Sequence, residues 1–280
     1  MRVVIFGGTG LLGSSIFYSL QKKGYKCFTS SQKKKSDFKS NLQSEKKILQ
    51  FLKKTNPNII INCSGETNVD LCNESFKTAF SSNVLTVKNI VSAIKKTKKK
   101  TYLMHISTDQ VYNHKRASVE DNIKISNYYG ASKYLGEIEA QKLKNSVILR
   151  TNFYGKSKAN KRLSYSDYLI YNLSKKKNIN IPINVYFNPI HVDYLSQIIL
   201  KLILFKINGV FNIGSKDVIS KYNFAKKIAM KYKLNLKYLK SFKSVYSINQ
   251  RPLSTFMSTK KLKNKLKIKI PKIQSGIDLL

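Results

Sequence analysis

Short apolar segments alternate with helix-like segments through the first half of the chain. Each apolar segment spans four or five residues, as expected for a strand buried on both faces of a parallel sheet. The helix-like segments repeat their apolar residues three or four positions apart, which is the spacing of one helix face. This order predicts an α/β fold built on a doubly wound parallel sheet. The predicted strands are residues 3–6, 26–29, 58–62, 102–106 and 146–150, and the predicted helices include 44–55 and about 73–98.

The alternation becomes less regular after residue 150. The elements expected there are a loop and helix at 160–175, a strand at 179–186, an apolar helix ending near 206, a strand at 209–213, a helix at 220–231 and a lysine-rich helix before 271. Pro182 places the 179–186 strand at a sheet edge or at a break. We expect a sheet-containing domain from residues 1–155 and about 185–213. Residues 156–184 and 214–280 form a smaller C-terminal lobe, which is not an independent domain.

A glycine-rich turn joins the first predicted strand to a helix. Gly7 permits a tight turn, Gly10 lets the backbone approach a pyrophosphate, and Gly13 lets the helix pack closely on the strand. The start of the helix offers free N–H groups to phosphates. The sheet is therefore predicted to be of the Rossmann type and to bind a dinucleotide. The candidate residues of this turn are Gly7, Thr9, Gly10, Leu11, Leu12 and Gly13.

The end of the second predicted strand bears on the choice of cofactor. An NAD site usually has an acidic residue here, which binds the 2′-hydroxyl of the ribose. This chain has Ser30 and Ser31, followed by Gln32 and three lysines at 33–35. Hydroxyl and ammonium groups suit a 2′-phosphate, so NADPH is favoured. Asp37 follows closely and keeps NADH open as the alternative.

A tyrosine and a lysine four residues apart suggest proton transfer. Tyr129 and Lys133 fall on one face of a predicted helix, so the phenol and the ammonium group can meet at one reacting atom. The positive charge of the lysine lowers the pKa of the phenol. The spacing alone is common in a chain with 17 Tyr and 52 Lys plus Arg. Thr108 strengthens the case, because it follows the fourth strand on the crevice side of the sheet, where its hydroxyl can bind a carbonyl oxygen.

The formal charge of +38 comes from 52 basic against 14 acidic residues. Such a surface attracts polyanions and anionic membranes. We consider nucleic-acid binding unlikely, because the excess is lysine and base readout favours arginine. No apolar run is long enough for a membrane span, the N-terminus does not resemble a signal peptide, and three cysteines do not form a disulfide framework. A cytoplasmic location follows.

These motifs together resemble the extended short-chain dehydrogenase/reductase family, and within it the dTDP-4-dehydrorhamnose reductases most closely. The resemblance covers nearly the whole chain. Its motifs are the glycine turn at 6–13, Asp37-Phe38, 62–70 ending in Asn68-Val69-Asp70, Ser107-Thr-Asp109, Tyr129-Gly-Ala-Ser-Lys133, Leu149-Arg-Thr151, Asn188-Pro189, 209–214 and Arg251-Pro252.

The resemblance implies a role for each site residue. Tyr129 would be the general acid, Lys133 would hold the nicotinamide ribose, and Thr108 would bind the carbonyl oxygen. Asp109 and Phe153 would contact the substrate. The residues that would contact the cofactor are Gly10, Leu11 and Leu12 at the pyrophosphate, Ser30, Asp37 and Phe38 at the adenosine half, and Ser64, Gly65 and Thr67 on the third loop.

The implied activity is NADPH-preferring reduction of the 4-keto group of a nucleotide-linked deoxysugar, in polysaccharide or cell-surface sugar synthesis. Gln110 stands where related dehydratases have glutamate, and an amide cannot serve as that acid. An epimerase or epimerase-reductase acting on another nucleotide sugar, such as a GDP-linked one, is the alternative. A non-catalytic relative that senses the cofactor or binds nucleic acid is less favoured. We expect no metal site, leave a homodimer open, and interpret His105 and His191 as structural.

Overall fold

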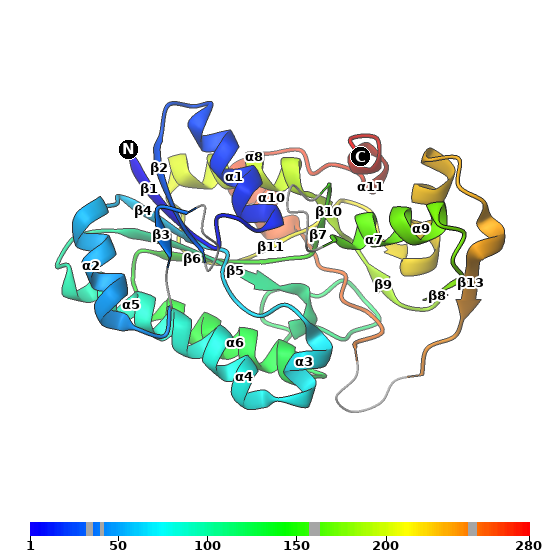
Figure 1. Cartoon of the computed structure of the whole chain (residues 1–280), viewed down its shortest axis with the longest axis horizontal. Coiled ribbons are helices and arrows are strands. Elements are labelled where there is room, and N and C mark those ends of the chain that lie inside the picture. The colour runs from blue at the N-terminus through cyan, green and yellow to red at the C-terminus, as the bar shows by residue number, and fades with distance from the viewer. Residues whose placement is uncertain (32–35, 40–41, 157–162, 246–250) are drawn as a thin grey trace.

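The computed structural model describes residues 1–31, 36–39, 42–156, 163–245 and 251–280. Its centre is a seven-stranded sheet in the order β11-β6-β5-β4-β1-β2-β3, and all neighbouring strands are parallel (Figure 1). The strands are β1 (Arg2–Phe6), β2 (Lys26–Ser31), β3 (Phe38–Lys39), β4 (Ile59–Asn62), β5 (Tyr102–Thr108), β6 (Ser146–Thr151) and β11 (Gly209–Ile213). The chain changes direction across the sheet between β1 and β4, which creates the crevice where α/β folds bind ligands. The predicted α/β, Rossmann-type fold is confirmed.

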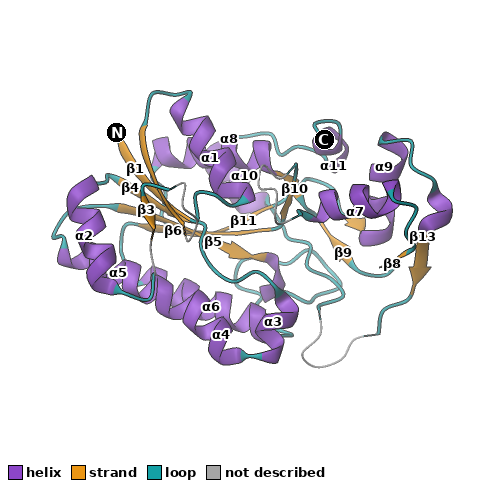
Figure 2. Cartoon of the chain, viewed as in Figure 1, coloured by secondary structure: helices purple, strands orange, loops and turns teal. Residues whose placement is uncertain are grey.

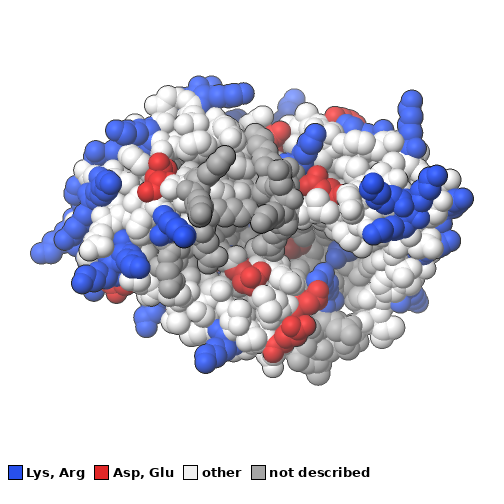
Figure 3. Space-filling view, in the orientation of Figure 1, with Lys and Arg blue, Asp and Glu red and all other residues white. Residues whose placement is uncertain are grey.

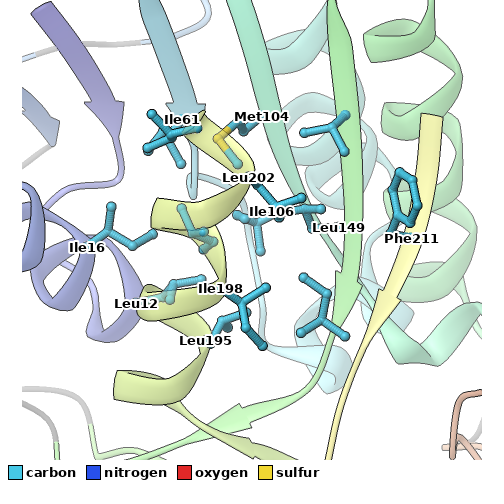
Figure 4. Packing of buried hydrophobic residues seen from close by; sticks show 14 of the residues in the cluster. Leu12, Ile16, Ile61, Met104, Ile106, Leu149, Leu195, Ile198, Leu202 and Phe211 are labelled. Carbon is cyan, nitrogen blue, oxygen red and sulfur yellow. The ribbon is translucent and has the colours of Figure 1, made fainter. Parts of the chain in front are cut away.

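Helices cover both faces of this sheet (Figure 2). The helices of one face are α1 (Leu11–Gln21), α8 (Val192–Phe205) and α10 (Lys260–Leu266), and those of the other are α2 (Glu45–Thr55), α5 (Thr86–Lys96) and α6 (Tyr128–Gln141). Successive strand residues point to opposite faces, so Met104 belongs to the first core and Leu103 to the second. In Figure 4, Leu12 and Ile16 of α1 and Leu202 of α8 lie against the strand residues. Both faces are buried, which explains the unbroken apolar runs.

The connection from β4 to β5 differs from the single helical stretch expected at 73–98. It contains α3 (Val69–Glu74), α4 (Phe76–Phe80), a π-helical turn (Ser81–Leu85) and α5. Ser75 adopts an extended conformation and its hydroxyl accepts a hydrogen bond from the Thr78 N–H, so it ends one helix and caps the next. The predicted helix was therefore wrong in its first turn, because Asn73 belongs to α3.

Smaller elements form a C-terminal lobe with its own core around Phe224. They are α7 (Tyr165–Ser174), α9 (Lys221–Lys231), α11 (Ile273–Ile277), and the paired strands β8 (Ile179–Pro182) with β13 (Leu239–Phe242) and β9 (Tyr186–Phe187) with β12 (Ile219–Ser220). A further pair, β7 (Phe153–Tyr154) with β10 (Ile190–His191), joins the two cores, because Tyr154 belongs to the core of the lobe and Ile190 to that of the sheet. The strand expected at 179–186 is interrupted after Pro182, which is the break that this proline predicted as one of two outcomes. The chain leaves β8 at Pro182, and β9 then pairs with a different partner. The expected boundaries between the sheet-containing domain and the lobe stay a prediction.

Because every strand of the main sheet runs in one direction, the sheet has two distinct ends. We call the end where the strands finish the carboxyl edge and the end where they begin the amino edge. In Figure 1 the amino edge lies near the N-terminus, and the carboxyl edge faces the C-terminal lobe. None of the helices within the described ranges is long and apolar enough to cross a membrane.

Candidate active site

The glycine turn lies at the carboxyl edge, between β1 and α1. Gly7 has a φ of +78°, and a Cβ there would come within 2.8 Å of the Cys63 backbone. A Cβ on Gly13 would lie 2.3 Å from the Gly7 carbonyl oxygen. The N–H groups of Gly7 and Gly8 donate to the Ser30 carbonyl at 2.9 and 3.3 Å, and Gly10 begins α1 without a side-chain cap. The turn is therefore packed too tightly for side chains, and it directs the uncapped start of a helix toward the crevice, as a pyrophosphate requires.

The residues expected at the adenosine half gather around the end of β2. Ser30 is fully buried, so its carbonyl rather than an exposed hydroxyl supports the glycine turn. The Asp37 carboxylate accepts hydrogen bonds from the N–H and hydroxyl of Thr29 at 2.6 and 3.1 Å. Phe38 stacks on Phe51 at 4.4 Å between ring centres, beside an open pocket of about 560 Å³. Gln32 and the lysines at 33–35 lie outside the described residues.

The loop after β4 is held by side chains from its own ends and from the π-helical turn. The Asn62 side-chain oxygen accepts from the Ser64 N–H and hydroxyl at 3.1 and 2.5 Å. Gly65 has a φ of +141°, and a Cβ there would lie 2.5 Å from the side-chain oxygen of Asn83. The Glu66 carboxylate accepts from the N–H groups of Thr67 and Asn68, both at 2.7 Å. The loop is thus fixed at the edge of the crevice.

Tyr129 and Lys133 occupy the first two turns of α6, next to the end of β5. Both side chains are buried, with 7% and 5% of their surface exposed. The Lys133 ammonium donates to the Ile106 carbonyl at 2.8 Å, which attaches α6 to β5. Thr108 is the last residue of β5, and its hydroxyl accepts from the Gln110 N–H at 3.2 Å. A Cβ on Gly130 would lie 2.5 Å from the Gln110 carbonyl oxygen, so the segment after Thr108 packs directly against the start of α6.

Electrostatics around Lys133 bring its titration close to neutral pH. Burial lowers the pKa of Lys133 to about 8, while the carboxylate of Glu137 raises it. Burial and the charge of Lys133 hold the pKa of His105 well below its ordinary value, so the imidazole is neutral. One of its nitrogens lies 3.1 Å from the Asn62 amide, an arrangement that agrees with a structural role. A lysine whose ammonium is easily deprotonated therefore lies one helical turn after the tyrosine.

A buried ion pair supports the base of the site. Glu137, one turn after Lys133, binds Arg150 of β6 through several hydrogen bonds, the shortest at 2.6 Å, and both side chains are buried. The hydroxyl of Ser107 also donates to Glu137. Arg150 donates to the Tyr112 hydroxyl at 2.7 Å. The network ties α6 to β5 and β6 below the catalytic candidates.

The two residues expected to contact the substrate have different surroundings. The Asp109 carboxylate is 2% exposed and accepts from Asn152 at 2.8 Å and Thr255 at 2.5 Å. Burial raises the pKa of Asp109, and these hydrogen bonds oppose the rise. Phe153 is half-buried and packs against the core beneath α8. Asp109 thus joins the end of β5 to the C-terminal segment, and its contact with a substrate stays a prediction.

The structure adds Asn83, Glu137 and Arg150 to the site. The amide nitrogen of Asn83 donates to the Glu66 carbonyl at 3.2 Å and to the Ser132 hydroxyl at 3.0 Å, which joins the β4 loop to α6. Its side-chain oxygen is buried with no hydrogen-bond partner among the described atoms. Two sequence features could have indicated the buried ion pair. Glu137 follows Lys133 by four residues, and Arg150 lies within the Leu149-Arg-Thr151 motif. Nothing in the sequence near Asn83 indicates its partners.

Three features together are typical of one class of enzyme. They are a glycine turn suited to a dinucleotide on a parallel sheet, a buried tyrosine and lysine four residues apart, and a threonine at the end of the neighbouring strand. This class is that of the NAD(P)-dependent oxidoreductases of the short-chain dehydrogenase/reductase type. The family model described as the RmlD substrate binding domain matches residues 1–280, and the chain belongs to this family.

Solved structures and a sequence relative agree with this membership. The dTDP-4-dehydrorhamnose reductase from Bacillus anthracis, in complex with NADP, has a TM-score of 0.88 and 25% identity and covers 99% of this chain and 97% of its own. A hypothetical dTDP-4-dehydrorhamnose reductase from Sulfolobus tokodaii has a TM-score of 0.86 and 26% identity and covers 99% of both chains. The spore coat polysaccharide biosynthesis protein SpsK of Bacillus subtilis is 25% identical over 230 residues, which are 80% of this chain and 77% of SpsK.

Proposed function

We propose that this protein uses NADPH to reduce the 4-keto group of a deoxysugar linked to a nucleoside diphosphate. The proposal is supported by the placement of Thr108 at the end of β5 and of Tyr129 and Lys133 in the first two turns of α6, which packs against the segment after Thr108 at the carboxyl edge, where the glycine turn also lies. The relatives from Bacillus anthracis and Sulfolobus tokodaii are dTDP-4-dehydrorhamnose reductases by description, which favours a dTDP-linked substrate. SpsK belongs by its name to polysaccharide synthesis, and we place this protein in the synthesis of polysaccharide or cell-surface sugars.

Each catalytic candidate has one task in this proposal. Tyr129 donates its phenolic proton to the carbonyl oxygen, and the Thr108 hydroxyl hydrogen-bonds to the same oxygen as its negative charge grows. Lys133 lowers the pKa of the phenol through its charge. When bound, NADPH supplies the hydride for the carbonyl carbon. Burial of all three side chains excludes water and strengthens the interactions of the ammonium group with its surroundings.

The cofactor preference rests on the end of β2 and on the Bacillus anthracis relative. That relative holds NADP. Because Thr29 already donates two hydrogen bonds to the Asp37 carboxylate, this acid is engaged before any ribose arrives. We therefore expect a higher kcat/KM with NADPH than with NADH. A higher value with NADH would contradict this preference while leaving the reduction itself intact.

Gln110 favours reduction over dehydration. Its side-chain oxygen accepts a hydrogen bond from Asn127 at 3.0 Å, and the Asn127 oxygen caps α6 by accepting from the Gly130 N–H at 2.7 Å. An amide with this structural role cannot deliver the proton that a dehydratase needs. The main alternative is epimerisation, or epimerisation followed by reduction, of another nucleotide sugar.

The test is the consumption of NADPH with purified nucleotide sugars. The protein is incubated with NADPH and either a dTDP-linked or a GDP-linked 4-keto-6-deoxysugar, and the absorbance of the reduced cofactor is followed. We expect oxidation with the dTDP-linked sugar. If neither sugar is reduced, the proposal is wrong, and a sugar that changes configuration without loss of NADPH identifies an epimerase.

A further inference from the structure

The amino edge of the sheet carries a dense set of lysines. Five segments lie at the amino ends of the strands, at residues 22–26, 53–58, 95–101, 142–145 and 204–209, and none of them contains an aspartate or a glutamate. Their exposed basic side chains are Lys22, Lys23, Lys26, Lys53, Lys54, Lys95, Lys96, Lys98, Lys99, Lys100, Lys142, Lys144 and Lys206. The positive charge of the chain is therefore unopposed within these segments.

Hydrogen bonds join these segments into one continuous surface. The bonds run from the Lys26 N–H to the Met1 carbonyl at 3.0 Å, from Asn58 to Arg2 at 2.9 Å, from Tyr102 to Asn58 at 3.0 Å, from Leu103 to Asn145 at 3.0 Å, and from the Tyr102 hydroxyl to the Ile207 carbonyl. Figure 3 shows basic side chains at this end of the molecule and also at the opposite end, whereas most acidic side chains visible on the same face lie nearer its middle. Two of these lysines form exposed ion pairs, Lys96 with Glu45 and Lys142 with Glu139.

Two large apolar side chains protrude from the same surface. Leu204 and Phe205 end α8 and are 68% and 61% exposed. Lys201 and Lys206 flank them and are also exposed. Protruding apolar side chains among lysines are the combination that binds the interface of an anionic bilayer, where the lysines contact headgroups and the apolar groups reach the acyl boundary.

We propose that the amino edge docks on an anionic lipid membrane, with Leu204 and Phe205 inserted among the headgroups. A nucleic-acid partner fits less well, because the five segments contain no arginine and Arg2 alone adjoins them among the described residues, whereas bidentate phosphate and base contacts favour arginine. Lys98–Lys100 lie just before β5, and Thr108 lies at its other end, about 20 Å away along the strand. A membrane bound at the amino edge therefore does not cover the active site. The proposal does not depend on which sugar the enzyme reduces.

The test compares two matched lysine runs on the full chain. Lys98–Lys100 and Lys175–Lys177 both follow a helix, are exposed, and include one residue with positive φ, but only the first run lies at the amino edge. Binding is measured by co-sedimentation with phosphatidylcholine vesicles, with and without phosphatidylglycerol, at physiological ionic strength. Changing Lys98, Lys99 and Lys100 to Gln should weaken binding to the anionic vesicles roughly 100-fold.

The same change at Lys175, Lys176 and Lys177 removes equal charge and should leave most of the binding. Leu204→Ser with Phe205→Ser should weaken it at least about tenfold, because two apolar side chains no longer leave water. NADPH oxidation by the amino-edge variants should match that of the unchanged protein. Equal loss in the two lysine variants, full binding by the Leu204/Phe205 variant, or displacement of the vesicles by duplex DNA at equal phosphate concentration would each overturn the proposal.

Discussion

The two edges of one parallel sheet differ in how they use charged residues. At the carboxyl edge, the charged side chains of Asp109, Lys133, Glu137 and Arg150 are buried and held by specific hydrogen bonds. At the amino edge, the lysines are exposed. Removing the partner of a buried charge destabilises the fold strongly, because the charge is left without solvation. A single exposed charge contributes little to stability, but many exposed charges together create a strong positive potential. The two proposals accordingly place the reaction at the carboxyl edge and the contact with a large anionic surface at the amino edge.

Removing one hydroxyl from the carboxyl edge should have the largest effect on catalysis. Tyr129→Phe should lower kcat by about 10²- to 10⁴-fold, because the carbonyl oxygen loses its proton donor. Tyr128→Phe is the matched control, since Tyr128 is 40% exposed and lies against Phe76. It should change kcat less than about twofold, the scale of an ordinary surface substitution. Equal activity in the two variants would exclude Tyr129 as the general acid.

Breaking an ion pair should cost more free energy of unfolding at the carboxyl edge than at the amino edge. Arg150→Met leaves the buried carboxylate of Glu137 without its partner, and we expect the free energy of unfolding to fall by about 3–5 kcal/mol. Lys142→Gln breaks the exposed pair with Glu139 and should cost at most about 1 kcal/mol. Urea denaturation followed by circular dichroism measures both. A similar loss in the two variants would show that burial does not distinguish the pairs.

The pH dependence tests the environment of Lys133. Its pKa of about 8 means that the ammonium is charged below this pH and loses its charge above it, so the reduction rate should fall as pH rises through about 8. Glu137→Gln removes a charge that raises this pKa, and the fall should move to lower pH. Glu139→Gln, two residues further along α6, should leave the profile unchanged. A profile that is identical in all three proteins would show that Lys133 does not control the rate.

A lysine in a left-handed backbone conformation should affect the stability of the fold only slightly. Lys206 follows the last turn of α8 with a φ of 45°, a position that glycine occupies with less strain. Lys206→Gly should stabilise the fold by about 0.5–1 kcal/mol. Lys201→Gly lies inside the same helix and should destabilise it by about 1 kcal/mol. Opposite signs in thermal denaturation would confirm that backbone conformation, not charge, decides both outcomes.

Local sequence patterns predicted the carboxyl edge better than the rest of the molecule. The glycine turn and the apolar strands follow from steric limits and burial within a few neighbouring residues, so they could be predicted without the structure. Asn83 joins the β4 loop to α6 through its hydrogen bonds with Glu66 and Ser132. Both partners are distant in the sequence, so no local pattern predicts these contacts. In the C-terminal lobe, Pro182 indicated a break, but the pairing of β9 with β12 was set by residues more than thirty positions away.

In the proposed reaction, hydride goes to a sugar carbonyl carbon at the carboxyl edge. The most direct measurement uses NADPH carrying deuterium at the transferable position, with a dTDP-4-keto-6-deoxysugar as substrate and NMR of the purified product. We expect deuterium at C4 of the sugar, formed at least about 100-fold more slowly by the Tyr129→Phe variant under the same conditions. A product that contains no deuterium at C4 but has changed configuration would show that the enzyme is an epimerase and does not reduce the carbonyl.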